Sequence, residues 1–101
     1  MDGSPIQKLV TAMMLSSIKK GARVIRIVAN DPIRVFFDFG SLCQEEMRPP
    51  GKLRGPMIAL LCEMSGATAY SPGHVTLLVK NVQYDWHATL RRNTFRLERV
   101  A

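Results

Sequence analysis

The stretch VQYDWHATL, residues 82–90, alternates between apolar and polar side chains along its whole length. Successive side chains of a β-strand point to opposite faces of the sheet. One face therefore carries Val82, Tyr84, Trp86, Ala88 and Leu90, and the other carries Gln83, Asp85, His87 and Thr89. This pattern predicts a strand that buries one face and leaves the other to solvent.

Turn residues on both sides of this strand extend the pattern into neighbouring strands. Asn81 precedes it, and Arg92-Asn93 follows it. These turns predict further strands over residues 74–80 and 94–100, each joined to the middle strand by a short connection. Short connections favour antiparallel pairing, because a parallel pair needs a crossover of about a dozen residues or more.

The first half of the chain carries a second group of strands. Residues 23–28, RVIRIV, are rich in β-branched side chains, and the turn sequence Asn30-Asp31-Pro32 follows them. From Ile33 onward the alternation returns, and this predicts a hairpin. A weaker strand is expected over residues 42–47, where Glu45 and Glu46 indicate an exposed edge.

Two segments have the periodicity of amphipathic helices. In residues 5–20, apolar side chains recur every three or four positions, Ser4 and Gln7 form a capping-box pattern, and Gly21 provides a stop. Residues 53–65 repeat the apolar spacing after Pro49-Pro50 and end before another glycine. The methionines on these stripes are predicted to fill the core; they are Met13, Met14, Met57 and Met64.

These elements predict an α+β fold formed by residues 1–101 as a single domain. An antiparallel sheet of five to six strands carries both helices on one face, in the order α-β-β-(β)-α-β-β-β. The length of 101 residues suits one small core. The N-terminus has no basic region before an apolar stretch, and no apolar run approaches the roughly 20 residues of a membrane-spanning helix. We therefore expect a cytoplasmic protein without membrane insertion.

The sequence offers little for catalysis or cofactor binding. It has neither a Gly-x-x-x-x-Gly-Lys-Ser/Thr loop nor a Gly-x-Gly-x-x-Gly turn for phosphates, and its two histidines lack a partner at metal-ligand spacing. We expect no enzyme activity, no cofactor and no metal. Cys43 and Cys62 are predicted to be buried thiols rather than a disulfide. An enzyme that uses one of them is the third hypothesis, and it requires a thiol of lowered pKa.

Basic residues are the most suggestive feature. The formal net charge is +6, and arginines gather in the first hairpin and in the last one. The first group is Arg23, Arg26 and Arg34, and the second is Arg91, Arg92, Arg96 and Arg99. Clustered arginines can bind phosphates or acidic protein surfaces through forked hydrogen bonds, although charged runs also keep a sheet edge soluble. Most aromatic side chains alternate toward the core, which disfavours a stacking surface for bases.

The run PIQKLV, residues 5–10, and the run MLSSIKKGA, residues 14–22, resemble the start of a known domain. It is the N-terminal domain that precedes the motor in type II secretion and type IV pilus assembly ATPases. The resemblance continues through residues 23–29 and 34–41, Pro49-Pro50 with the second helix, and residues 84–89. It implies a PAS-like α+β domain that sits beside a motor, whereas the motor's phosphate loop and acidic boxes have no counterpart in this sequence.

The differences from that family fall on its polar signature. Arg23, Val24 and Arg26 stand at its Ser-Asp and His positions, Val28-Ala29 at its Glu-Pro, and Gly40-Ser41 at its Asp-Gly. Of its Arg-x-Arg-x-Arg pattern only Arg34 remains, with Phe36 and Asp38 in the other places, and His87 aligns with an arginine of the later strand. These differences imply a domain that folds like its relatives but no longer assists nucleotide hydrolysis.

The leading hypothesis is a non-catalytic protein-interaction or regulatory module. Its protein partner would be a motor ATPase or another secretion component, bound through Arg23, Arg26, Arg34 and His87. The alternative is a small basic nucleic-acid-binding protein, since phosphate contacts by lysine and arginine dominate such binding. A homo-oligomer is compatible with either hypothesis.

Overall fold

The computed structural model describes residues 4–30 and 32–100, and it has two helices and a six-stranded sheet. The elements are α1 (Pro5–Lys20), β1 (Val24–Val28), β2 (Arg34–Asp38), β3 (Cys43–Met47), α2 (Arg54–Ser65), β4 (Gly73–Val79), β5 (Val82–Arg91) and β6 (Thr94–Arg99), with a short 3₁₀ turn, η1 (Gly51–Leu53), before α2. The order α-β-β-β-α-β-β-β confirms the predicted α+β fold. Asp31, part of the predicted first turn, lies outside the described residues.

Helix α1 begins and ends as its sequence predicts. The amide of Gln7 donates to the Ser4 hydroxyl, and the Gln7 side chain accepts from the Ser4 amide, so the capping box is complete. Gly21 ends the helix with a left-handed φ of 77° and donates its amide to the carbonyl of Ile18. These local contacts fix the helix ends independently of the rest of the fold.

The sheet consists of two three-stranded meanders that meet in its middle. The strand order is β3-β2-β1-β6-β5-β4, and every neighbouring pair is antiparallel. The meanders join where β1 pairs with β6, with Arg26 opposite Arg96. β3 and β4 therefore form the two edges, and the edge position of β3 agrees with the prediction from its glutamates.

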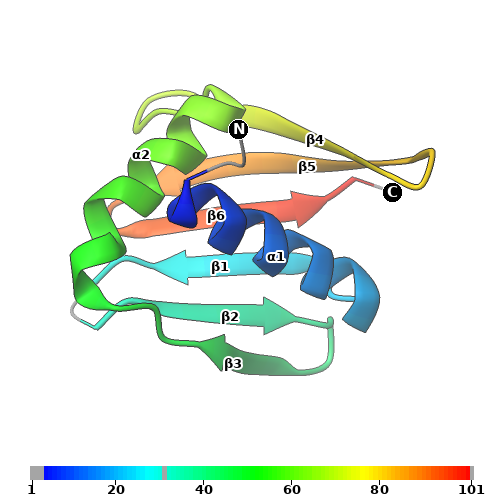
Figure 1. The fold of residues 1–101 in the computed structure, drawn as a ribbon, viewed down its shortest axis with the longest axis horizontal. Helices are drawn as coiled ribbons and strands as arrows, with labels where there is room; N and C mark the ends of the chain where they lie inside the picture. The colour runs from blue at the N-terminus through cyan, green and yellow to red at the C-terminus, as the bar shows by residue number, and fades with distance from the viewer. Residues whose placement is uncertain (1–3, 31, 101) are drawn as a thin grey trace.

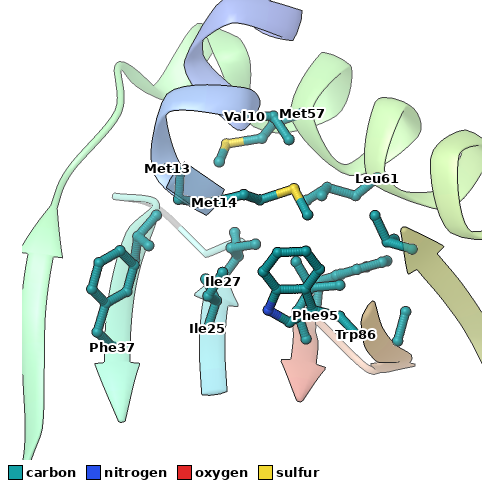
Figure 2. Close-up of a cluster of buried hydrophobic side chains, with 14 of the residues drawn as sticks. Val10, Met13, Met14, Ile25, Ile27, Phe37, Met57, Leu61, Trp86 and Phe95 are labelled. Atoms are coloured by element: carbon teal, nitrogen blue, oxygen red, sulfur yellow. The ribbon is translucent and has the colours of Figure 1, made fainter. Parts of the chain in front are cut away.

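Both helices cover the same face of the sheet (Figure 1). The core lies between the two layers, with Met13 and Met14 of α1 facing Ile27 and Trp86 of the sheet (Figure 2). Trp86 is fully buried. In β5 the alternation is the predicted one, since Trp86 and Ala88 are buried while His87 between them is exposed. We call the opposite, uncovered side of the sheet the open face.

Gly73 marks the closest approach between the second helix and the sheet. Helix α2 ends at Ser65, and the chain then turns back so that β4 begins directly beside that end. A β-carbon placed on Gly73 would lie 2.3 Å from the carbonyl oxygen of Ser65 and 2.5 Å from the amide nitrogen of Ala67. Only a residue without a side chain fits this contact.

Two predictions about buried residues are wrong. Met64 was expected in the core but is 39% exposed, because it lies on the outer side of α2 beside the groove toward α1. Cys43 was expected to be buried but is exposed, because it lies on edge strand β3 and pairs with Asp38. Cys62 is half-buried against the core, and both cysteines are free thiols.

Candidate functional site

The open face carries most of the polar side chains of the sheet. The register places them in rows, since Phe36, Arg26 and Arg96 lie opposite one another on β2, β1 and β6. The ionisable side chains of the open face are Arg26, Arg34, Asp38, Glu45, His74, Asp85, His87, Arg91, Arg96 and Glu98. Both signs are present, so the face is a patterned surface rather than a uniformly basic one.

On the β2–β1 side of this face, two arginines flank one aromatic ring. The guanidinium carbon of Arg26 lies 5.6 Å from the centroid of the Phe36 ring, and that of Arg34 lies 5.4 Å from it. Both distances are within the range of about 6 Å for cation–π attraction. The register explains this arrangement, because Arg26 is the cross-strand partner of Phe36 and Arg34 lies two positions before it on β2. We call these three side chains the Arg–Phe–Arg cluster.

The two arginines of the cluster differ in their other contacts. Arg26 donates from Nη2 to the sulfur of Cys43 at 2.7 Å, while its Nε is buried without a hydrogen-bond partner in the described chain. None of the ion pairs among residues 4–30 and 32–100 includes Arg34. The Phe36 ring thus packs against both guanidinium groups, and that of Arg34 has no hydrogen-bond partner in the described chain, so its donors remain available for a ligand.

Neighbouring charges on this face are already paired. Arg96 donates to Glu98 at 2.9 Å, and Glu45 accepts from Arg48. The hydrogen bond from Arg48 lowers the pKa of Glu45, and the charge of Arg34 contributes in the same direction. Glu46 points to the other side of the sheet, where it pairs with Lys20 of α1. Among the arginines of this face, Arg26, Arg34 and Arg91 take part in none of the ion pairs of the described residues.

A second group of polar side chains surrounds Asp85 near the β4 edge. The Asp85 carboxylate accepts hydrogen bonds from the Thr76 hydroxyl at 2.6 Å, from Gln83 at 3.0 Å and from His74 at 3.1 Å. The Thr76 hydrogen bond is the largest cause that lowers the pKa of Asp85, followed by that from Gln83. A carboxylate held in its charged form accepts protons less readily near neutral pH, so this group stabilises the sheet rather than resembling a general base.

Replacing Asp85 with asparagine should lower the free energy of unfolding by an amount that depends on pH. The folded pKa lies below the unfolded value of about 3.9, so the carboxylate stabilises the fold above that value and loses this effect as pH falls through the folded pKa. We expect Asp85→Asn to be less stable than the wild type at neutral pH, with the difference shrinking in acid. Urea unfolding at several pH values measures it.

Thr76→Val provides the matched variant for this prediction. It removes the principal donor, so the pKa of Asp85, followed by NMR, should return toward its ordinary value. A stability difference between the wild type and Asp85→Asn that stays constant with pH would contradict the assigned role of Asp85.

The structure brings together some of the predicted site residues. Arg26 and Arg34 meet at Phe36, and His87 lies on the same face, in one row with its cross-strand partners His74 of β4 and Glu98 of β6. Arg23 is separate from them. It precedes β1 and, by alternation with buried Ile25, lies on the helix side, where it lines a hollow with Ile18, Gly21, Ala22, Tyr84, Arg99 and Val100.

Sequence reasoning missed Phe36 as part of the site. It treated the aromatic residues mainly as core, and this holds for Phe37, Trp86 and Phe95, which are all fully buried. The alternation on β2 already puts Phe36 on the face of Arg34, two positions away, and that spacing is the signal that identifies the residue.

In the described part of the chain, His, Cys, Asp and Glu side chains form no group of three that could hold a metal ion. Neither α1 nor α2 has the length and apolar character required to cross a membrane. Models of known protein families give no match to the sequence, and neither do curated proteins.

Proposed function

We propose that the chain is a non-catalytic interaction module that binds an acidic segment of a protein partner on the open face of its sheet. The observation that carries this proposal is the Arg–Phe–Arg cluster, in which Phe36 holds Arg26 and Arg34 at 5.6 and 5.4 Å. Ordered guanidinium groups lose less conformational entropy when a carboxylate binds, and they can make bidentate hydrogen bonds. No element of the described chain covers this face (Figure 1).

The resemblance to the N-terminal domains of secretion and pilus assembly ATPases suggests what kind of partner to test. In this proposal the module contacts a motor ATPase or another component of such a system. The sequence supports a role other than phosphate binding, since it has no phosphate-binding loop and keeps only Arg34 of the family's arginine pattern. The sequence retains the apolar positions of that family's framework. In this proposal the difference in function from the family therefore lies on the surface.

Nucleic-acid binding is the second candidate, and the net charge of +6 favours it. Stacking of bases requires accessible aromatic rings. Most aromatic rings of the described chain lie in the core or pack against it, Phe36 is enclosed by two arginines, and Tyr70 stands alone in the loop before β4. The surface therefore suits carboxylates better than unpaired bases.

Removing the two arginines of the cluster should abolish most of the binding to acidic peptide. In a fluorescence-anisotropy titration with a labelled glutamate-rich peptide at low salt, we expect each of Arg26→Ala and Arg34→Ala to weaken binding about tenfold. Hydrogen bonds to charged groups contribute about 1.5–3 kcal/mol, and 1.4 kcal/mol is a factor of ten. The matched control is Lys8→Ala combined with Lys52→Ala, which removes two exposed charges from other parts of the surface.

The lysine control and an oligonucleotide probe distinguish the possible outcomes. Loss of binding in the arginine variants, with binding retained in the lysine control, supports the proposed site. Equal losses in both would show that only net charge matters. Binding of a single-stranded oligonucleotide but not of the peptide would favour the second candidate, and binding of neither probe at low salt would overturn both.

A further inference from the structure

The two edges of the sheet are protected to very different degrees. Edge strand β3 is five residues long, carries Glu45 and Glu46, and is interrupted by a register shift opposite Val35 and Phe36. Charges and bulges of this kind prevent an edge from pairing with another chain. Edge strand β4 is seven residues long, GHVTLLV, and pairs with β5 in one unbroken register. It contains no lysine, arginine, carboxylate or proline, so its edge is open to pairing.

The turn between β4 and β5 identifies the free backbone groups of β4. Its two residues, Lys80 and Asn81, have φ values of 49° and 66°, as in a type I′ hairpin turn. In such a hairpin the flanking pair, Val79 and Val82, exchanges both hydrogen bonds, and bonded pairs then recur at every second position. Backbone amides and carbonyls of the intervening residues point away from the sheet; these residues are His74, Thr76 and Leu78.

We propose that β4 pairs with β4 of a second copy of this chain, antiparallel about a two-fold axis that passes through Thr76. Thr76 is the middle residue of β4, so this axis pairs the strand along its whole length. Thr76 faces the partner's Thr76, and His74 faces Leu78. Each of these outward-facing residues then exchanges both backbone hydrogen bonds with its opposite residue.

The side chains are self-complementary in this register. On the helix side, Val75 of one copy lies opposite Leu77 of the other, which extends an apolar layer across the axis. On the open face, Leu78 is 67% exposed in the single chain and gains a neighbour. No two like charges face each other. An isologous pair of this kind needs one surface that complements itself, and the sequence of β4 meets that condition.

The second copy explains the strand better than an unrelated peptide does. Pairing with a strand of an unrelated protein would not explain why Val75 matches Leu77, or why Thr76 matches a second Thr76, in this register. The pairing also leaves the Arg–Phe–Arg cluster free, because that cluster lies on the β2–β1 side of the sheet. The two-fold axis is perpendicular to the sheet, so both open faces would lie on the same side of one continuous sheet.

Sedimentation equilibrium of the wild-type chain and two variants tests the proposal. We expect the wild type to dimerise with rising concentration. Thr76→Lys places two lysines opposite each other at the axis and should weaken dimerisation at least about tenfold. The matched control, Gln44→Lys, adds the same charge to the β3 edge and should dimerise like the wild type. A wild type that stays monomeric up to millimolar concentration, or a Thr76→Lys dimer as tight as the wild type, overturns the proposal.

Amide hydrogen exchange provides a readout that does not depend on a variant. Protection of the His74, Thr76 and Leu78 amides should rise with protein concentration, while Val75 and Leu77, whose amides already bond to β5, should not respond. A concentration-dependent change at Cys43–Met47 instead would place the interface at the other edge and contradict the assignment.

Discussion

Replacing Trp86 with alanine should lower the free energy of unfolding by about 3–5 kcal/mol. The indole is fully buried between the sheet and the two helices, and it is one of the largest side chains of the core (Figure 2). Deleting it removes apolar contacts from the core and leaves a cavity that the surrounding side chains fill only in part. Because domains of this size are stable by roughly 5–15 kcal/mol, the variant should retain a narrow margin. Urea denaturation followed by circular dichroism measures the change.

Two other variants test whether the loss of stability comes from the packing of the Trp86 side chain. Tyr70→Ala removes an aromatic ring that is 99% exposed, and it should change stability very little. Trp86→Phe keeps most of the ring and removes the indole Nε1, which is buried without a hydrogen-bond partner in the described chain. We expect this variant to cost much less than alanine, since an unsatisfied buried donor is lost with the extra ring. Equal losses for Trp86→Ala and Tyr70→Ala would contradict the assigned core.

Adding one methyl group at Gly73 should destabilise the chain by about 1–3 kcal/mol or more. The new β-carbon would meet the backbone of Ser65 at 2.3 Å, and backbone atoms cannot rotate away as a side chain can. Either β4 or the end of α2 must move, which disturbs the pairing of Gly73 with Ala88. Chemical denaturation of Gly73→Ala measures the cost.

Gly55→Ala is the matched control, and it should change stability much less than Gly73→Ala. Gly55 lies in the first turn of α2, and a β-carbon there would meet nothing within 4 Å apart from its chain neighbours and the backbone of its own helix. Alanine in a helix is favoured over glycine by roughly 0.5–1 kcal/mol, but Pro56 follows directly and disfavours a helical residue with a β-carbon before it, so the two effects oppose each other and the net change should be small. If both variants destabilised the chain equally, the close contact at Gly73 would not be the cause.

Features that depend on neighbouring residues could be predicted from the sequence. The capping box and the stop at Gly21 fix α1 locally, and the alternation around Trp86 assigns the buried side of β5. Turns such as Lys80-Asn81 pair strands that are adjacent in the chain. The antiparallel α+β fold with both helices on one face follows from these signals, and the structure confirms it.

Features that depend on distant pairing could not be predicted in the same way. No turn joins β1 to β6, so no local sequence signal indicates that Arg26 lies opposite Arg96. The grouping of Arg26 with Arg34 around Phe36 needs the β1–β2 register, and without it Arg23 was assigned to the same surface. Cys43 was predicted to be buried because free cysteines often are, but it lies on edge strand β3 opposite Asp38, on the face that the helices do not cover.

The position of β6 has a consequence for synthesis of the chain on the ribosome. β6 follows all the other strands in sequence, yet it lies in the middle of the sheet between β1 and β5. Translation adds about 5–20 residues per second, so for several seconds β1 has emerged without one of its two neighbours. During that interval Ile25 and Ile27 face a half-built core, and the backbone groups of β1 that later pair with β6 have no partner strand. Translation speed and chaperone access over residues 24–93 should therefore affect the yield of folded protein.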